Sequence, residues 1–362
     1  MKIAFYIDTM VRCGAQRVMA NLINYYLEQN YDVVLINDFP LSDSIPQYVF
    51  PSNLIRHYLH EKNKKGFFLK NIQRVLRLRK VIKMEKPSIA ISFLGRVNIR
   101  FLIATIKMPL KKIVSVRNDP RHEYGSSSIY KSLSNMLFRL ADGIVFQTQE
   151  ASLYFDKVLE RKKAIIPNSV DPVFFDTPYI GGEGIVTFGR LEPQKKHSLL
   201  IDSFGEIASK YPNINLFIYG VGSLEKKLKE QIENSGLSKR VFLMGVTDDV
   251  RKELSKAMLF VLSSDYEGMP NALMESLAVG VPSISTDCPC GGPRDLIQNG
   301  VNGILVPCDD KRSMVNAIDN MLANNRLRQT ISENARKTAK LFSPTIINEK
   351  WQSFFMKVLN SN

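Results

Sequence analysis

Short apolar runs alternate with longer amphipathic segments along the whole chain. Runs that are apolar at consecutive positions are typical of parallel strands covered by helices on both faces. Such strands, alternating with amphipathic helices, predict doubly wound α/β sheets. We expect strands at residues 3–7, 33–36, 89–93, 113–116, 143–146, 164–166, 185–188, 216–219, 241–243, 258–262, 282–285 and 303–306.

A stretch rich in proline and glycine, residues 167–184, interrupts this alternation near the middle of the chain. Twelve expected strands are too many for one ordinary open sheet, so we interpret the stretch as a linker. The pattern predicts two Rossmann-like domains, over 1–175 and 176–343, that face each other across a cleft. The last residues, 344–362, carry apolar side chains at helical spacing and predict a helix packed on a domain surface.

The segment from Met258 to Gly280 carries the strongest chemical signal of the chain. An apolar strand opens through a Gly/Pro turn into a helix that Gly280 ends, and Glu267 and Glu275 bracket the turn, eight residues apart. A helix N-terminus after such a turn binds anions, because its backbone N–H groups and its dipole point outward. Ionised carboxylates accept hydrogen bonds, which suits sugar hydroxyls. The combination predicts a nucleotide-sugar pocket.

A second turn between a strand and a helix, which begins at Gly189, offers Arg190 and Lys195. Arginine presents a rigid fork of donors to phosphate, and lysine presents a mobile point charge. A turn that contains two cations is by itself more often a solvated basic loop than a phosphate site. We predict a diphosphate site here because this turn and the Glu267 turn follow parallel strands of one domain and meet at the same sheet edge.

Two loops in the first half are weaker candidates. Gly14 lies in the turn between the first strand and the first helix, where a glycine lets the backbone approach a ligand closely. Asn118 follows another strand, between Arg117 and Asp119, and polar side chains at that place belong to a cleft. An ordinary turn or a solvated loop explains each of them equally well.

The positive charge of the chain is concentrated in its first half. The net charge is +14, and residues 1–175 hold 27 Lys and Arg against 14 Asp and Glu, whereas residues 176–362 hold 22 against 21. Such asymmetry indicates an anionic partner for the first domain, either nucleic acid or a membrane surface.

Residues 66–83 predict a basic amphipathic helix. An anionic bilayer attracts such a helix, but a helix that covers a domain core and has a solvated basic back shows the same pattern. We expect it to cover the core, and the pattern leaves open whether its back meets lipid. Its expected apolar face holds Phe68, Ile72, Val75, Leu76 and Ile82, and its expected basic face holds Lys70, Arg74 and Arg77. Arg79 and Lys83 interrupt the apolar face.

Several classes of protein are disfavoured by what the sequence lacks. No apolar run reaches the ~18 residues of a membrane span, and the first eight residues read as a strand rather than a signal peptide. Four cysteines form no disulfide framework, which indicates reduced thiols and a cytosolic protein. No set of Cys, His and carboxylates has the spacing of metal ligands, so we expect no metal. A P-loop and a G-x-S-x-G elbow are also missing.

Taken in order, four segments resemble the motifs of family 4 glycosyltransferases with the GT-B architecture. The resemblance covers essentially the whole chain, and the segment with the two glutamates is its most specific part. The segments are Gly14-Ala15-Gln16-Arg17-Val18, Gly189-Arg190-Leu191 with Lys195, Glu267-Gly268-Met269-Pro270-Asn271 with Glu275, and Asp287-Cys288-Pro289-Cys290-Gly291-Gly292-Pro293.

The resemblance implies retaining transfer of a sugar from a nucleotide diphosphate, without a bound metal or another cofactor. In that pattern Arg190 and Lys195 hold the diphosphate, Glu275 binds the ribose hydroxyls, and Glu267 lies near the hydroxyls of the donor sugar. Gly14 lets the diphosphate approach the first domain, and the last helix crosses back to that domain. The segment that contacts sugar and phosphate is Gly268, Met269, Pro270, Asn271 and Ala272.

One departure from the family pattern concerns the base. Many members carry a catalytic histidine at the place where this chain has Arg117-Asn118-Asp119. This favours a path in which the leaving phosphate oxygen deprotonates the acceptor and the cations stabilise the leaving diphosphate. Asn118 is the candidate catalytic side chain at that position.

We therefore predict a glycosyltransferase that moves a sugar from a nucleotide diphosphate, a UDP-sugar by the resemblance, to a lipid-linked or growing surface saccharide. Its expected location is cytoplasmic and peripheral, on the inner face of the cell membrane, with the basic N-terminal domain on the anionic surface. The nearest alternative is transfer to a soluble sugar phosphate. A nucleic-acid-binding protein is a remote alternative, because no recognition motif accompanies the basic residues.

Overall fold

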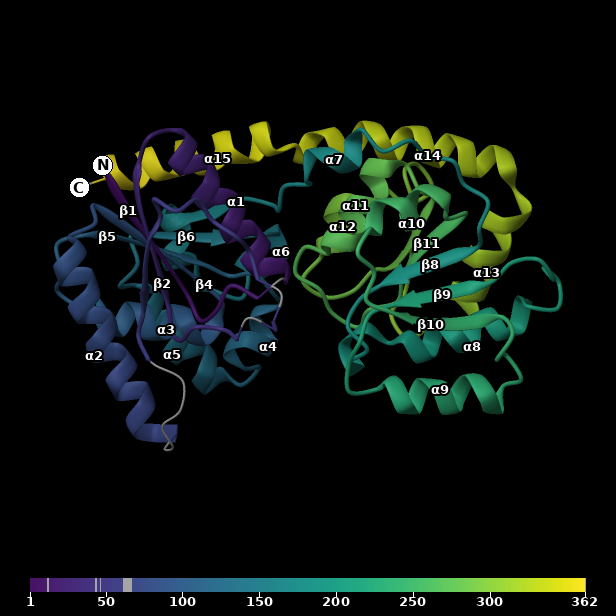
Figure 1. Cartoon of the computed structure of the whole chain (residues 1–362), viewed down its shortest axis with the longest axis horizontal. Coiled ribbons are helices and arrows are strands. Elements are labelled where there is room, and N and C mark those ends of the chain that lie inside the picture. The colour runs from purple at the N-terminus through teal and green to yellow at the C-terminus, as the bar shows by residue number, and fades with distance from the viewer. Residues whose placement is uncertain (12, 43, 46, 61–66, 362) are drawn as a thin grey trace. The chain divides into compact units, whose positions relative to one another are not determined.

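The chain divides into two compact units, and each of them is an α/β domain (Figure 1). The computed structural model describes residues 1–11, 13–42, 44–45, 47–60 and 67–361, without the side chains of residues 67–70 and 158. The first unit comprises Met1–Asn168 and Ile347–Asn362, and the second comprises Ser169–Ile346. The boundary therefore lies before residue 175, because Phe174 packs into the core of the second unit.

The first unit is built on a seven-stranded parallel sheet with the order β3-β2-β1-β4-β5-β6-β7. Its central strands are buried along their length, as expected for strands that helices cover on both faces. The strands are β1 (Lys2–Ile7), β2 (Asp32–Asn37), β3 (Ile55–Tyr58), β4 (Ile89–Phe93), β5 (Lys111–Ser115), β6 (Gly143–Phe146) and β7 (Lys163–Ile165).

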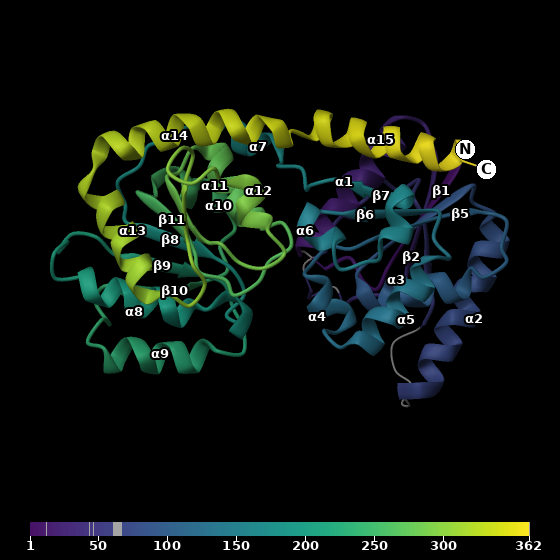
Figure 2. The ribbon, with the colours of Figure 1, turned by 180° about the vertical axis from the view of Figure 1, so that it is seen from behind.

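Helices α1 and α15 cover one face of this sheet, and α2, α3 and α5 cover the other (Figures 1 and 2). The last helix contributes to the core, because Trp351 is fully buried and Phe355 stacks on Tyr26 with ring centroids 5.0 Å apart. The helices are α1 (Gly14–Glu28), α2 (Phe67–Glu85), α3 (Gly95–Ala104), α4 (Pro120–Tyr124), α5 (Ser128–Phe138), α6 (Gln149–Ser152), the 3-10 turn η1 (Lys157–Lys162) and α15 (Pro344–Asn360).

The second unit holds a six-stranded parallel sheet with the order β10-β9-β8-β11-β12-β13. One apolar core lies on each of its faces, against α8 and α13 on one side and against α11 and α14 on the other. The strands are β8 (Ile185–Phe188), β9 (Leu216–Tyr219), β10 (Val241–Gly245), β11 (Leu259–Leu262), β12 (Ser283–Thr286) and β13 (Ile304–Val306).

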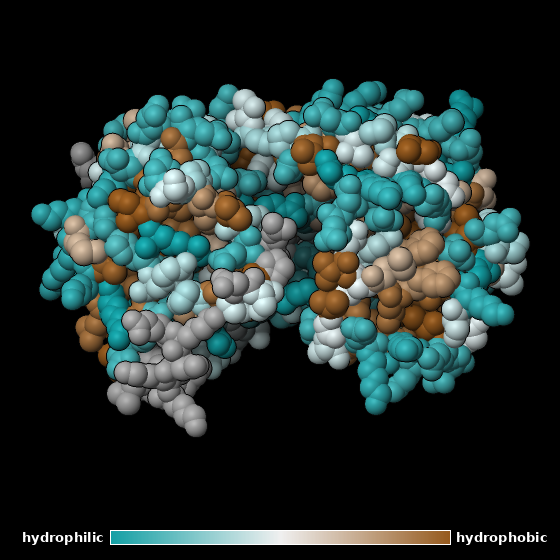
Figure 3. Space-filling model, viewed as in Figure 1, coloured by the Kyte–Doolittle hydropathy of each residue, from teal (hydrophilic) through white to brown (hydrophobic). Residues whose placement is uncertain are grey.

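Hydrophobic surface on the second unit gathers over the β9 and β10 edge of the sheet (Figure 3). Met244 and Val246 are exposed there, at the end of the edge strand. The helices of this unit are α7 (Pro172–Phe175), η2 (Pro193–Lys195), α8 (His197–Ile207), α9 (Glu225–Asn234), α10 (Val250–Lys256), α11 (Asn271–Val279), α12 (Gly292–Leu296), α13 (Lys311–Ala323), α14 (Asn325–Ala339) and η3 (Lys340–Phe342).

The twelve expected strands are all confirmed, within two residues at their ends. The pattern missed β3, because the strand Ile55-Arg56-His57-Tyr58 has no apolar run and lies at the sheet edge. None of the helices in the described part of the chain is long and apolar enough to cross a membrane.

The expected apolar face of α2 is wrong in part. Ile72 and Leu76 are exposed, whereas Ile82 is buried as expected. Arg74 turns inward to Asp38, and Arg79 is held against the first unit because it donates hydrogen bonds to two carbonyl oxygens at the end of α3. Phe68 and Lys70, which were assigned to opposite faces, have side chains outside the described part of the chain.

Candidate functional site

The predicted second-half site lies where the order of the second sheet reverses. The neighbouring strands β8 and β11 run parallel, and the chain leaves them for opposite sides of the sheet, to β9 and to β12. The loops that follow β8 and β11 therefore diverge and leave a crevice at the carboxyl ends of the strands, which is the usual ligand site of such sheets.

The loop after β8 carries Gly189, Arg190 and Lys195. A side chain at residue 189 would crowd the aliphatic stem of Lys195, since a Cβ there would lie 3.2 Å from two of its carbon atoms. Gly189 thus lets Lys195 lie across the backbone of its own loop. Arg190 is exposed beside it. Both cations lie at the mouth of the sheet, as the sequence predicts.

The loop after β11 is tied to this first loop by side chains. Lys195 forms an ion pair with Glu267, and Ser264 Oγ donates a hydrogen bond of 2.7 Å to the same carboxylate oxygen. Gln194 Nε2 donates to the carbonyl oxygen of Tyr266 at 2.8 Å. Glu267 is only 7% exposed, so its carboxylate is held in one place by a cation and a hydroxyl. The sequence did not single out Ser264 or Gln194, although both lie inside the motifs that it quotes.

Helix α11 begins directly after Pro270, at the place where the sequence predicts an anion site. Its N-cap position has no side-chain hydrogen bond and its first turn has no acidic residue, so the positive end of its dipole is not neutralised from within the helix. Glu275 lies one turn further on and is 4% exposed. The helix ends at Gly280, which has the left-handed conformation (φ 92°) that glycine favours, as predicted.

Close backbone packing holds these loops together. A Cβ on Gly292, at the start of α12, would lie 1.7 Å from the carbonyl oxygen of Gly268. A Cβ on Gly220, after β9, would lie 1.9 Å from the carbonyl oxygen of Gly189. Only glycine allows these approaches. The loops of four neighbouring strands thus form one rigid rim, which includes the predicted Met269, Asn271 and Ala272.

Two titratable groups close to this rim, His197 and Cys288, are uncharged at pH 7. His197, behind the loop after β8, is buried, and burial together with the charge of Lys195 lowers its pKa to about 4. Its imidazole is therefore neutral at pH 7. Burial, with Glu267 nearby, raises the pKa of the Cys288 thiol, so Cys288 is protonated. The positive groups of the rim are thus Arg190, the helix dipole of α11, and Lys195, whose charge Glu267 balances.

Gly14 and Asn118 belong to the first unit, and the ten other predicted site residues belong to the second. Gly14 begins α1 directly after the loop that follows β1, and Asn118 follows β5, so both lie at carboxyl ends of strands of the first sheet. These positions agree with the sequence, which also treated the two residues as the weaker candidates.

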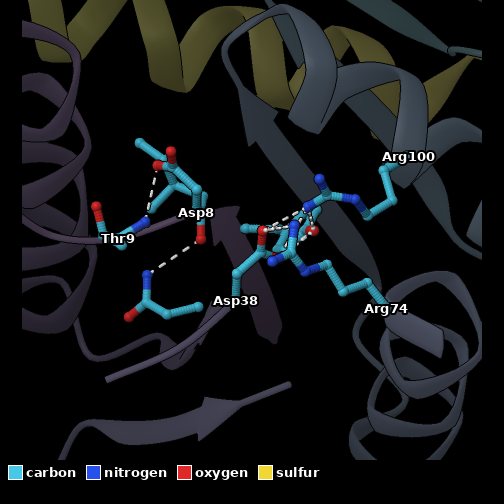
Figure 4. A network of polar contacts seen from close by, with 8 residues as sticks. Asp8, Thr9, Asp38, Arg74 and Arg100 are labelled. Carbon is cyan, nitrogen blue, oxygen red and sulfur yellow. Dashed lines mark hydrogen bonds and ion pairs between the residues drawn. The ribbon is translucent and has the colours of Figure 1, made fainter. Parts of the chain in front are cut away.

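A polar network that the sequence did not predict lies at the ends of β1 and β2 (Figure 4). Asp38 accepts a hydrogen bond of 2.8 Å from Tyr6 and one of 2.6 Å from Arg100, and Arg74 lies 3.5 Å from the same carboxylate. Asp8 lies near this group, and burial raises its pKa. The signal in the sequence was the placement of Asp8 and Asp38 directly after apolar strands.

The first unit also contains a cavity of about 360 Å³ that the sequence did not predict. It lies between the start of α3, the short helix α4 and α5, and it is lined by Arg96, Glu123, Tyr130 and Leu133 among others. Burial raises the pKa of Glu123 to about 8, although the Gly95 amide donates to it, and one of its oxygens has no hydrogen-bond partner. A carboxyl group in a short polar helix carries no pattern that marks it in advance.

Comparison with known proteins finds sequence relatives of this chain. Residues 180–338 match the family model of the Glycosyl transferases group 1. Across the full length of both chains, the protein is 25% identical to the Campylobacter jejuni GalNAc-alpha-(1->4)-GalNAc-alpha-(1->3)-diNAcBac-PP-undecaprenol alpha-1,4-N-acetyl-D-galactosaminyltransferase. A second enzyme of that organism, N-acetylgalactosamine-N,N'-diacetylbacillosaminyl-diphospho-undecaprenol 4-alpha-N-acetylgalactosaminyltransferase, is 26% identical over 94% of this chain and 95% of its own.

The fold is also found among solved structures. Anabaena HepE, crystallised with UDP and glucose, has a TM-score of 0.79 to this chain, with 18% identity over 99% of this chain and 100% of its own. Two α/β units with parallel sheets are the GT-B arrangement that the sequence predicted. The chain is a glycosyltransferase with the GT-B fold, and its residues 180–338 match the group 1 glycosyl transferases.

Proposed function

We propose that this enzyme transfers a sugar from a UDP-sugar to a lipid-linked saccharide, with retention of configuration at the anomeric carbon. The observation that carries the donor site is the set of groups around the crevice between β8 and β11: Arg190, the Lys195–Glu267 pair, and the N-terminus of α11. Cations and amides suit a diphosphate, and the carboxylates of Glu267 and Glu275 suit hydroxyls.

In the proposed reaction the protein acts mainly by stabilising the charge of the leaving group. The bond between the anomeric carbon and the diphosphate oxygen breaks, and Arg190, Lys195 and the α11 amides stabilise the negative charge that develops on the leaving oxygen. The leaving oxygen takes the proton of the acceptor hydroxyl, whose oxygen bonds to the anomeric carbon. We propose no metal and no other cofactor. The roles of Gly14 toward the diphosphate and of Asn118 near the acceptor stay predictions.

The acceptor proposal rests on the relatives. Both Campylobacter jejuni enzymes are named for undecaprenyl-diphosphate-linked saccharides. The excess of positive charge in the first half suits an anionic membrane, and we propose that the enzyme works on its cytoplasmic face. Transfer to a soluble sugar phosphate is the alternative, and nothing in the fold of the donor site distinguishes the two acceptors.

Donor binding is tested by thermal shift against a panel of UDP- and GDP-sugars. A ligand that binds only the folded state raises the melting temperature, and we expect this for a UDP-sugar. Glu275→Gln and Arg190→Ala should reduce the shift and the transfer rate, whereas Lys226→Ala should change neither, because Lys226 is an exposed cation on α9. If Glu275→Gln and Arg190→Ala both kept the full shift and rate, the assignment of the donor site would be wrong.

The acceptor and the stereochemistry are tested by product analysis. Transfer to a polyprenyl-diphosphate saccharide in vesicles supports the proposal, whereas transfer only to a soluble sugar phosphate supports the alternative. The configuration at the new anomeric carbon, read by NMR, should equal that of the donor. Activity that survives a chelator supports the absence of a metal, and activity that a divalent cation restores argues against it.

A further inference from the structure

Helix α5 exposes an apolar face that none of the described residues covers. Ile129, Leu133 and Met136 follow one another at helical spacing and are 77%, 48% and 57% exposed. Tyr130 beside them is 59% exposed. The opposite side of the helix is packed, since Phe138 is fully buried and stacks on Phe155 with ring centroids 4.4 Å apart. The helix is therefore held firmly by one side and presents apolar side chains with the other.

The neighbouring helices α3 and α2 also expose apolar side chains. Helix α3 packs between α5 and α2 in one layer (Figure 1), and its end exposes Ile103 and Ile106. Helix α2 exposes Ile72 and Leu76, two of the five residues that the sequence placed on its apolar face. Three neighbouring helices thus leave large apolar side chains uncovered.

The stretch of sequence that forms these helices and the strands β4 and β5 between them is strongly basic, although Arg74, Arg100 and Arg117 within it turn inward. Residues 67–140 hold sixteen Lys and Arg against three Asp and Glu, a net charge of +13, so the excess of the whole first half lies in this segment. No acidic residue occurs between Glu123 and Asp142, the stretch that contains α5. Lys131 within the helix and Arg139 at its end are both exposed.

We propose that the exposed face of α5 is the element by which the enzyme docks on an anionic lipid bilayer. Apolar side chains at helical spacing, flanked by cations and free of carboxylates, match the boundary between acyl chains and anionic headgroups. A second copy of this chain is a poor occupant, because two faces with this excess of positive charge repel each other. The inference rests on the proposed lipid-linked acceptor and names the surface that brings the enzyme to it.

The cavity of the first unit adjoins the docking face. Tyr130 and Leu133 of α5 line the cavity and are exposed on the face as well. Arg96 and Glu123 add a cation and a carboxyl group to the lining. An acceptor whose lipid chain stays in the bilayer would thus have its polar part next to a cavity with mixed apolar and charged walls, at the carboxyl ends of β4 and β5.

Vesicle flotation of the full-length protein tests the proposal. The vesicles contain phosphatidylcholine alone or with ~30% phosphatidylglycerol. The variant is Ile129→Ser with Met136→Ser, two substitutions at exposed positions that leave the packed side of α5 intact. We expect the unchanged protein to float with the anionic vesicles and the variant to bind at least ~10-fold more weakly. Addition of salt should weaken the binding of the unchanged protein.

A matched control removes exposed apolar side chains from the second unit. Met244→Ser with Val246→Ser changes the apolar edge seen in Figure 3, where Val246 is 74% exposed. This control should float like the unchanged protein. Equal flotation of the α5 variant and the unchanged protein, or an equal loss in the control, would overturn the proposal, and so would flotation that is independent of phosphatidylglycerol. Circular dichroism and the UDP-sugar thermal shift verify that both variants are folded.

A transfer assay separates this proposal from the proposed function. With a polyprenyl-diphosphate saccharide in anionic vesicles, the α5 variant should lose at least ~10-fold in rate, whereas it should keep its rate on a short-chain, water-soluble analogue of the same acceptor. Loss of rate on both acceptors would place α5 in the active site and overturn its docking role. If the unchanged protein transfers sugar to neither acceptor, the proposed function fails, and flotation still decides whether α5 docks.

Discussion

The Lys195–Glu267 pair is the residue-level feature on which the donor site depends most. The two charges neutralise each other while Ser264 holds the carboxylate in place, so the free enzyme keeps a buried acid beside a cation. Lys195→Met leaves Glu267 without its cation. We expect kcat/KM for transfer to fall about 100-fold, because stabilisation of the leaving diphosphate is lost.

The same substitution should lower the free energy of unfolding by ~1–3 kcal/mol, since removal of one partner leaves the other charge buried. Urea unfolding and steady-state kinetics measure the two effects. The matched variant Lys195→Arg keeps the charge and should lose less in both. A rate for Lys195→Met equal to that of the unchanged enzyme would remove Lys195 from the proposed site.

Glu123 makes the stability of the first unit depend on pH. Burial raises its pKa from the ordinary 4.5 to about 8, against the opposing effects of the Gly95 amide and of Arg117. The folded protein therefore keeps a proton that the unfolded chain releases, and stability falls as the pH rises from about 4.5 through 8. Glu123→Gln stays neutral and should lose this dependence.

At pH 8.5 the Gln variant should be more stable than the unchanged protein by ~1–3 kcal/mol, and at pH 5 the two should be nearly equal. Hydrogen exchange of peptides from β4 and β5, measured at both pH values, assigns the effect to the first unit. A pH profile that is the same for both proteins would show that Glu123 is ionised in the folded protein.

At the scale of elements, the rim of the donor site depends on glycines where loops cross. Gly292→Ala places a methyl group 1.7 Å from the carbonyl oxygen of Gly268, so the loop after β11 must move. We expect a loss of ~2–4 kcal/mol in stability and a strong loss of the UDP-sugar thermal shift. Gly205→Ala in α8 is the control, because its Cβ meets only an ordinary contact at 3.4 Å. It should raise stability by ~0.5–1 kcal/mol and leave donor binding unchanged.

The elements of the fold could be predicted wherever one physical signal dominated. Strands buried on both faces are mostly apolar, so β4 and β8 were placed correctly from the sequence. The edge strand β3 is half polar and was missed. The orientation of α2 was wrong in part, because helical spacing shows that an apolar side exists but not which contacts compete for it. Arg74, which the spacing placed on the basic back, is drawn inward by Asp38, a partner that only the fold supplies.

The same distinction applies to the candidate site. Glu267, Lys195 and the start of α11 were found because each follows a strand within one continuous motif. The sequence did not predict the cluster of Asp38, Arg74 and Arg100, since these residues come from three elements that are far apart in the sequence. The carboxyl ends of strands can be predicted from a single sequence, but the side chains that cross from neighbouring helices to meet them cannot.

At the scale of the whole molecule, the two units differ in the number of chain segments that form them. The second unit is one continuous segment, Ser169–Ile346, whereas the first needs residues from both ends of the chain. The returning segment is part of the core, because Trp351 and Phe355 of α15 are buried against the first sheet. Trp351→Ala should therefore cost the first unit about 3–5 kcal/mol and leave the second unit unchanged.

Because only the second unit is continuous in sequence, fragments of the two units should behave differently. A fragment of residues 169–346 contains a complete sheet and both of its cores, so it should fold alone and keep the thermal shift with a UDP-sugar. A fragment of residues 1–168 lacks α15 and exposes the apolar surface that Trp351 and Phe355 cover, so it should be unstable or aggregate. Addition of a peptide of residues 344–362 should restore its near-UV circular dichroism in a saturable way. If the fragment 1–168 were as stable without the peptide as with it, α15 would not be needed for the stability of the first unit.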